Sequence, residues 1–220
     1  MEGSFKILVA DDHEVVREGL RALLEKQPGL TVCAEASNGR EAVERAIELR
    51  PDVVIMDLAM PELNGLEATR RILREAPRTA ILILSARDSE EMVREVLAAG
   101  ARGFVLKTDA ARDLVVAVEG LRHGRPFFSA RVAELVLRGY LQGGVTVDHL
   151  DRARAPALTV REREVLQLLA EGRSNKEVAA TLSIGVKTAE AHRANLMRKL
   201  AVRSIPDLVR YAIRNHLVEP

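Results

Sequence analysis

The stretch Phe5-Lys-Ile-Leu-Val-Ala-Asp-Asp12 is a short apolar run that ends in two acidic residues. Four further apolar runs of similar length follow it, at Leu30–Glu35, Val53–Met56, Ala80–Leu84 and Gly103–Leu106. The segments between them are long enough for helices and carry apolar residues at helical spacing. Nearly continuous apolar strands that alternate with helices predict a parallel sheet with both faces covered. We therefore expect a doubly wound α/β domain over residues 1–123.

Polar side chains stand at the carboxyl ends of four of these runs, which is where such a sheet places its ligands. They are Asp11 and Asp12, Asp57, Ser85 and Lys107. Any one of them could simply cap a helix or point into water, but together they favour a site. Crowded carboxylates need a proton or a cation to compensate their charge. Carboxylates, a hydroxyl and a lysine fit Mg²⁺ and phosphoryl chemistry, with one carboxylate as the nucleophile, better than a transition metal.

Composition divides the chain into two parts with different partners. The net charge of the 220 residues is +1, yet residues 1–129 carry −4 and residues 157–220 carry +4. A basic carboxyl-terminal part is a candidate for binding a polyanion. The aromatic content of 3% argues against base stacking on single strands, and the single Cys33 excludes an intramolecular disulfide and a cysteine zinc cluster. With no apolar run of roughly 18 residues, we expect a cytoplasmic protein without a membrane segment.

The second half of the chain predicts a linker and a small helical domain. A short amphipathic helix is expected within Arg125–Tyr140, and apolar periodicity is lost over residues 143–156, so residues 124–156 are predicted to be a linker with a short helix. Residues 157–220 predict four helices, the first with Thr159 and Glu162 as a capping box. Helices at Asn175–Leu182 and Val186–Leu200, joined by a tight turn, are typical of a helix-turn-helix.

A helical wheel divides Val186–Leu200 into an inner and an outer face. The residues predicted to pack inward are Val186, Ala189, Leu196 and Leu200. Cations that could meet DNA phosphates are Lys187, Arg193, Arg198 and Lys199. The alternative interpretation is an ordinary helical domain with a solvated charged face.

Residues 5–123 resemble the receiver domain of two-component response regulators. The resemblance is carried by Lys6-Ile-Leu-Val-Ala-Asp-Asp12, Met56-Asp-Leu-Ala-Met-Pro-Glu-Leu-Asn-Gly65, Ser85-Ala86 and Gly103-Phe-Val-Leu-Lys107. It implies that Asp57 accepts a phosphoryl group from a sensor histidine kinase. It also implies that Asp12, Asp57 and the backbone carbonyl of Ala59 hold Mg²⁺, with Asp11 acting through water. Lys107 would pair with the phosphoaspartate, Ser85 would hydrogen-bond a phosphoryl oxygen, and Phe104 would change rotamer on activation.

Residues 158–217 resemble the carboxyl-terminal DNA-binding domain of the LuxR family. The matching stretches are Leu158-Thr-Val-Arg-Glu-Arg-Glu-Val-Leu166, Ser174-Asn-Lys-Glu-Val-Ala179 and Lys187-Thr-Ala-Glu-Ala-His-Arg-Ala-Asn195. The resemblance implies that the DNA backbone is contacted by Asn175, Lys176, Thr188, His192 and Lys199, and that bases face Glu190, Ala191 and Ala194. The chain departs from the family pattern at Gly185, a weaker N-cap than the usual Ser or Thr. It departs again at Glu190, where a carboxylate could accept from cytosine N4.

By this resemblance, the last predicted helix, Pro206–His216, corresponds to the helix that pairs DNA-bound subunits in the family. The candidate interface residues are Leu208, Val209, Ala212 and Ile213, with core packing as the alternative for each.

Both resemblances together are typical of the NarL/FixJ class of response regulators. The expected fold is a flavodoxin-like (βα)5 receiver, a linker, and an all-α, four-helix LuxR-type helix-turn-helix domain. The expected function is a transcription factor, not an enzyme, in which phosphorylation of Asp57 controls dimerisation and binding to promoter DNA. The alternatives are a ligand-sensing regulator that is not phosphorylated, and a small-molecule phosphatase or phosphotransferase.

Overall fold

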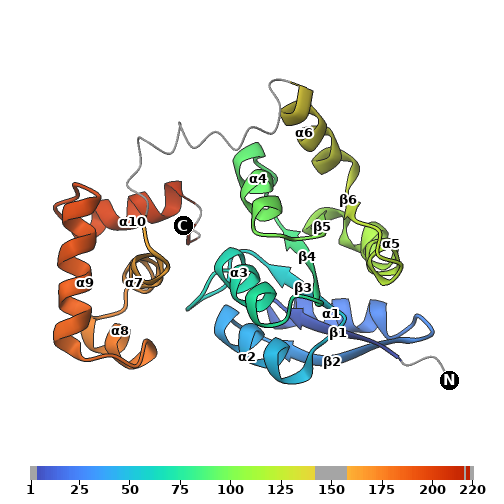
Figure 1. Cartoon of the computed structure of the whole chain (residues 1–220), viewed down its shortest axis with the longest axis horizontal. Helices are drawn as coiled ribbons and strands as arrows, with labels where there is room; N and C mark the ends of the chain where they lie inside the picture. Colours follow the sequence, from blue (N-terminus) through green and yellow to red (C-terminus); the bar gives the residue numbers. More distant parts are fainter. Residues whose placement is uncertain (1–3, 142–157, 216, 219–220) are drawn as a thin grey trace. The chain divides into compact units, whose positions relative to one another are not determined.

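The computed structural model describes residues 4–141, 158–215 and 217–218, which form an α/β unit and a helical unit (Figure 1). The predicted linker, residues 143–156, lies outside the described residues. The strands of the α/β unit are β1 Phe5–Ala10, β2 Leu30–Ala36, β3 Val53–Asp57, β4 Ala80–Ser85, β5 Gly103–Leu106 and β6 Phe127–Phe128. Its helices are α1 Glu14–Leu24, α2 Gly39–Leu49, α3 Gly65–Glu75, α4 Glu90–Ala98, the 3₁₀ turn Lys107–Asp109, α5 Ala110–Arg122 and α6 Ala130–Leu141. The five predicted strands are therefore confirmed.

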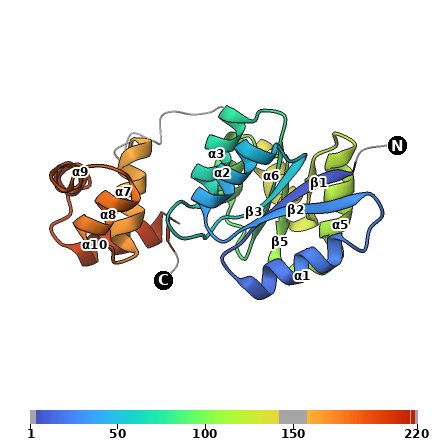
Figure 2. The same ribbon diagram turned by 90° about the horizontal axis from the view of Figure 1, so that it is seen from below.

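The strands form one parallel sheet in the order β2-β1-β3-β4-β5-β6. The central strand β3 is buried along its whole length. Apolar side chains of the sheet pack against Leu20 and Leu24 of α1 and Leu114 and Leu121 of α5 on one face. Helices α2 and α3 lie side by side on the opposite face (Figure 2). Burial on both faces explains why the strands read as almost unbroken apolar runs.

Local hydrogen bonds and close backbone packing determine where the helices on that face begin. The side chains of Asn38 and Asn64 accept hydrogen bonds from the backbone N–H groups of Glu41 and Glu67, so each asparagine caps a helix. Gly65, the first residue of α3, lies directly against the end of β3. A Cβ at this position would stand 1.9 Å from the carbonyl oxygen of Asp57. Only glycine lets the backbone of α3 approach β3 this closely.

The sheet has a sixth strand that the sequence analysis assigned to the linker. Phe127 and Phe128 pair in parallel with Gly103 and Phe104, and the backbone N–H of Ser129 donates to the carbonyl of Phe104 at 3.0 Å. The predicted amphipathic helix follows as α6 and packs against α4. The α/β unit therefore extends past residue 123. An apolar strand of two residues is too short to produce a periodic signal.

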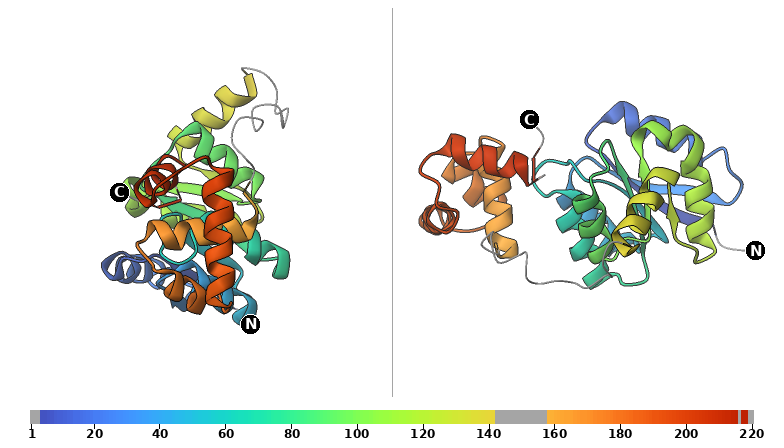
Figure 3. Two further views of the ribbon diagram at one scale, coloured as in Figure 1. Left: turned by 90° about the vertical axis from the view of Figure 1, so that its left-hand side faces the viewer. Right: turned by 90° about the horizontal axis from the view of Figure 1, so that it is seen from above.

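The helical unit has four helices in its described residues, as predicted: α7 Val160–Ala170, α8 Asn175–Thr181, α9 Val186–Lys199 and α10 Ile205–Arg214. Thr159 and Ser174 each form a capping box, with Glu162 and Glu177. Apolar side chains from all four helices share one core that includes Leu166 and Leu196. The left panel of Figure 3 shows α9 as the long helix that crosses the shorter helices of this unit.

One sequence prediction about a buried position in this unit was wrong, and two positions of α10 that the sequence left open between core and subunit interface lie in the core. Val186 is 39% exposed, because it is the first residue of α9 and has no preceding turn to cover it. Leu208 and Ala212 are wholly buried in the core of their own chain, so they have no surface to offer a second subunit. On α10 only the half-buried Val209 and Ile213 remain of the four candidate interface residues. Among the described residues, no helix is long and apolar enough to span a membrane.

Candidate functional site

The carboxyl ends of β1 and β3 bring acidic side chains together. These strands are neighbours in the sheet, with Ala10 opposite Met56, so the residues that follow them, Asp11 and Asp57, lie side by side. Both are buried, at 0% and 3% exposure. One ligand atom from each of Asp11, Asp12, His13 and Asp57 lies within 4.8 Å of every other. The structure therefore assembles the acidic cluster that the sequence predicted.

Lys107 supplies the positive charge that offsets these buried carboxylates. It follows β5, and its Nζ lies 2.7 Å from Asp11 Oδ2 and 2.8 Å from Asp57 Oδ2. Burial raises the pKa of the Asp57 carboxyl above its ordinary value, and the Lys107 ammonium only partly opposes this rise. Burial alone would lower the pKa of Lys107, but its hydrogen bonds to Asp11 and Asp57 outweigh burial and raise it. The lysine is therefore held as a cation against the acidic cluster.

His13 belongs to this cluster, although the sequence analysis did not single it out. Its Nδ1 lies 2.7 Å from Asp12 Oδ1 and 3.3 Å from Asp11 Oδ1, and its backbone N–H donates to Asp11 Oδ1 at 2.9 Å. The imidazole is largely exposed, at 64%. The one available signal was its position directly after the acidic pair.

The donor set fits a hard divalent cation. Carboxylate oxygens from Asp11, Asp12 and Asp57 converge, and Asp12 is exposed, so an ion could keep water ligands on the open side. Ala59 lies two residues past Asp57 in the loop that leaves β3, and its backbone N–H reaches Asp57 Oδ1 at 3.4 Å. The backbone of this loop therefore runs beside the cluster, where the sequence analysis expected the Ala59 carbonyl.

Ser85 and Phe104 lie on the neighbouring strands β4 and β5. The Ser85 hydroxyl, 4% exposed, accepts a hydrogen bond from the backbone N–H of Arg87 at 3.1 Å and lies 3.7 Å from Met92 Sδ. Phe104 is wholly buried. In the sheet, Phe104 pairs with Ile83, two residues before Ser85. The two predicted switch residues are therefore close in the fold, at the same end of the sheet as Asp57.

The helical unit presents an exposed, mostly polar face on α8 and α9. The residues predicted to meet DNA that are exposed are Lys176, Lys187, Thr188, Glu190, Ala191, Ala194 and Arg198. Those that are half-buried are Asn175, His192, Arg193 and Lys199. The N-cap of α9 is Gly185, which makes no side-chain cap hydrogen bond.

Four of these residues already have partners within the unit. Lys199 Nζ lies 2.7 Å from Glu162 Oε2, the glutamate of the α7 capping box. Arg198 donates to Asn195 Oδ1 at 2.8 Å, and Arg193 to Asn175 Oδ1 at 3.5 Å. Lys199 is thus held at the start of α7 by an ion pair. This pair with Glu162 would have to break before the whole positive charge of Lys199 could act on a DNA phosphate.

Two family models match the chain, one over each unit. Residues 7–119 match the response regulator receiver domain, and residues 156–212 match the bacterial regulatory proteins of the luxR family. The first match covers the acidic cluster with Lys107, and the second covers α7, α8 and α9.

Curated relatives match along the whole chain. The transcriptional regulatory protein LiaR of Bacillus subtilis is 41% identical over 214 residues, which are 97% of this chain and 99% of LiaR. The oxygen regulatory protein NreC of Staphylococcus epidermidis is 39% identical over 217 residues, again 97% of this chain and 99% of the relative.

Solved structures of similar sequence agree with this assignment. The RcsB response regulator of Salmonella typhimurium is 29% identical with a TM-score of 0.59, covering 96% of this chain and 98% of RcsB. A LuxR-family two-component response regulator from Aurantimonas sp. SI85-9A1 is 37% identical with a TM-score of 0.59, covering 62% of this chain and 97% of that one. The chain therefore belongs to the NarL/FixJ class of two-component response regulators, with a receiver domain followed by a LuxR-type DNA-binding domain.

Proposed function

We propose that Asp57 is the phosphoacceptor of this DNA-binding response regulator, and that its phosphorylation controls dimerisation and promoter binding by the helical domain. The observation that carries the proposal is the buried pairing of Asp57 with Lys107 beside Asp11, at the carboxyl end of the sheet. The Asp57 oxygen can act as the nucleophile, and the Lys107 ammonium already lies where it can offset part of the negative charge that a phosphoryl group would add.

In the proposed reaction, an oxygen of Asp57 forms a bond to the phosphorus of a phosphohistidine on the sensor kinase. The P–N bond breaks, its electron pair stays on the donor imidazole, and Asp57 becomes an acyl phosphate. Mg²⁺ held by Asp12, Asp57 and the Ala59 carbonyl, with Asp11 acting through water, would offset charge on the phosphoryl oxygens. Lys107 keeps its ammonium beside the new phosphoryl group. Because the chain itself is the acceptor, no small-molecule product is released and the protein is not an enzyme in the usual sense.

The proposed readout begins at Ser85. A phosphoryl group adds three strong acceptor oxygens, and the Ser85 hydroxyl is the donor that can turn towards them, away from Met92. That movement would vacate space next to Phe104, which is wholly buried and has room to rotate only if a neighbour moves.

Promoter DNA is the proposed target of the exposed face of α8 and α9. The described cations Lys176, Lys187 and Arg198 lie on this face, and Ala191 and Ala194 would let the backbone of α9 approach base edges. An RcsB–DNA complex, 28% identical, and a structure of two RcsB dimers bound to DNA support both DNA binding and dimerisation. We also propose that residues 143–156 join the two domains. No observation favours the ligand-sensing alternative.

Incubation with acetyl phosphate and Mg²⁺ tests the phosphoacceptor. The expected result is one hydroxylamine-labile phosphoryl group on the peptide that contains Asp57, absent from the Asp57→Asn variant. Failure of the wild-type protein to acquire this label would sink the proposal.

A further inference from the structure

Arg17 connects α1 to the loop that carries the acidic pair. Its side chain is only 15% exposed, and its Nη1 donates to the backbone carbonyl oxygen of Asp11 at 2.8 Å. Its Nε pairs with Glu35 Oε2 of β2 at 3.4 Å. We infer that Arg17 is a positioning residue, which holds the Asp11–His13 loop in the shape that presents the Asp11 and Asp12 carboxylates to Mg²⁺. The inference rests on the proposed function, because it concerns the same metal site.

The Asp11 carbonyl lies where regular strand pairing stops. The backbone N–H of Asp11 still donates to the carbonyl of Ala36 on β2 at 3.1 Å, but β1 ends at Ala10 and α1 begins at Glu14. Within the described residues, the Arg17 guanidinium is the donor to the Asp11 carbonyl. Asp11 is completely buried, so water cannot easily replace that donor. The orientation of the peptide between Asp11 and Asp12 therefore depends on Arg17.

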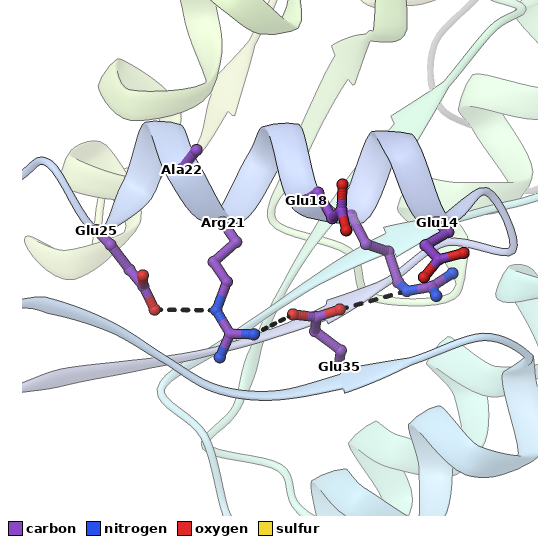
Figure 4. Close-up of a pocket in the computed structure, with 7 residues that line it drawn as sticks. Glu14, Glu18, Arg21, Ala22, Glu25 and Glu35 are labelled. Carbon is purple, nitrogen blue, oxygen red and sulfur yellow. Dashed lines mark hydrogen bonds and ion pairs between the residues drawn. The ribbon is translucent and has the colours of Figure 1, made fainter.

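Arg17 is itself held by a chain of charges along α1. One carboxylate oxygen of Glu35, Oε2, pairs with Arg17, and the other, Oε1, lies 2.5 Å from Arg21 Nη1. Arg21 also pairs with Glu25 at 3.1 Å. Figure 4 shows these contacts at the surface pocket along α1, where Glu35 of β2 reaches up to Arg21 and Glu25 lies on the opposite side of Arg21. The Arg17 guanidinium therefore has two contacts, the Asp11 carbonyl and the Glu35 carboxylate, and together they fix the plane of the group as a single contact would not.

Positioning and simple electrostatics predict opposite results when Arg17 is removed. If the guanidinium acts only as a positive charge near a cation site, its loss would make Mg²⁺ bind more tightly. If it positions the loop, its loss would make Mg²⁺ bind more weakly, although a repelling charge has gone. Substitution of a residue that orients metal ligands typically weakens metal binding by about 10–100-fold.

The test compares Arg17→Ala and Arg17→Lys with Arg21→Ala as the matched control. Arg21 shares the helix, the charge and the Glu35 partner of Arg17, but its hydrogen bonds are with Glu35 and Glu25 and not with Asp11. Mg²⁺ affinity of the metal-free full-length proteins is measured by isothermal titration calorimetry, which does not depend on phosphorylation. The backbone amide resonances of Asp12 and His13 are recorded in the same metal-free samples.

The expected result for Arg17→Ala is a loss of about tenfold in Mg²⁺ affinity together with exchange-broadened Asp12 and His13 amides. The maximal rate of phosphorylation by acetyl phosphate should recover at saturating Mg²⁺. Arg17→Lys keeps the charge and one donor for the Asp11 carbonyl but not the planar guanidinium held at two points, so it should recover only part of the affinity lost in Arg17→Ala. A Mg²⁺ affinity below that of the wild type in Arg17→Lys also keeps the test decisive if the alanine variant does not fold. Arg21→Ala should bind Mg²⁺ as the wild type does.

Equal or tighter Mg²⁺ binding by Arg17→Ala would overturn the inference and leave the proposed function intact. A loss of affinity as large in Arg21→Ala would overturn it as well, because the effect would then belong to the helix and not to Asp11. Absence of Mg²⁺ binding by the wild-type protein would contradict the proposed function and this inference with it.

Discussion

Substitution of Gly65 by alanine tests the close packing between α3 and the phosphoacceptor strand. The added Cβ would lie 1.9 Å from the carbonyl oxygen of Asp57 and 3.0 Å from Leu58 Cα. Both contacts are with backbone, so no flexible side chain can move aside. Because ordinary contact distances are about 3.5 Å, α3 and the end of β3 must separate by more than about 1 Å.

The expected change in the free energy of unfolding is the sum of two losses and one gain. Overpacking against rigid neighbours costs about 3 kcal/mol. The hydrogen bond from the Gly65 N–H to the Leu58 carbonyl, now 2.9 Å, would be lost and costs about 1 kcal/mol more. The better helix propensity of alanine returns about 1 kcal/mol. The expected net loss of unfolding free energy is about 3 kcal/mol. A displacement of Asp57 by about 1 Å would also slow phosphorylation about 100-fold.

Gly19 of α1 is the matched control, since a Cβ there meets nothing within 4 Å. Gly19→Ala should be neutral or stabilising by up to about 1 kcal/mol. Unfolding in urea is followed by hydrogen-exchange mass spectrometry of peptides from β3 and β4, which reports the α/β domain separately from the helical domain. If Gly65→Ala were as stable as Gly19→Ala and were phosphorylated at the wild-type rate, the account of α3 packing would be wrong.

Three further predictions concern the helical domain. Burial tends to raise the pKa of Glu162, but Lys199 and the Thr159 cap outweigh burial and hold this pKa below its ordinary value. The wild type should therefore be more stable than Glu162→Gln at any pH above the ordinary glutamate pKa, and this advantage should disappear as the pH falls through the lowered pKa. Urea unfolding of both proteins from pH 7 to acid measures the difference. Lys187→Ala should weaken specific and non-specific DNA binding alike and reduce the slope of log K against log salt by about 0.9, and an unchanged slope would remove this residue from the phosphate contacts. Leu166 is 0% exposed, so Leu166→Ala should lower the free energy of unfolding by about 2–5 kcal/mol. Val160 is 37% exposed, so Val160→Ala should lower it by less than about 1 kcal/mol. Similar losses in the two variants would argue against the described core.

Most of the α/β domain and its acidic cluster could be predicted because strand ends follow from local sequence. Runs such as Val53–Met56 are apolar throughout, and topology alone brings the residues that follow such parallel runs to one edge of the sheet. The sixth strand could not be predicted in this way. Phe127 and Phe128 form a strand only because β5 offers an unpaired edge, which is a property of the sheet and not of those two residues.

The parts of the site that were missed depend on side-chain reach. Arg17 looks like one of several charged residues on an exposed helix, and only the folded chain reveals its bond to the Asp11 carbonyl. The sequence left Leu208 and Ala212 of α10 open between core packing and a subunit interface for a related reason. Helical spacing identifies an apolar stripe, but it does not say whether the stripe faces the core of the same chain or a second subunit.

DNA selection from a random-sequence pool, with and without phosphorylation of Asp57, tests the central claim most directly. The full-length protein is incubated with Mg²⁺ in the presence or absence of acetyl phosphate, and Asp57→Asn is carried through both arms. We expect the phosphorylated wild type to enrich a two-fold symmetric sequence with higher affinity than the unphosphorylated protein, and Asp57→Asn to give the same result in both arms. Phosphorylation of Asp57 that leaves the affinity and the selected sequence unchanged would contradict the claim that this residue controls promoter binding.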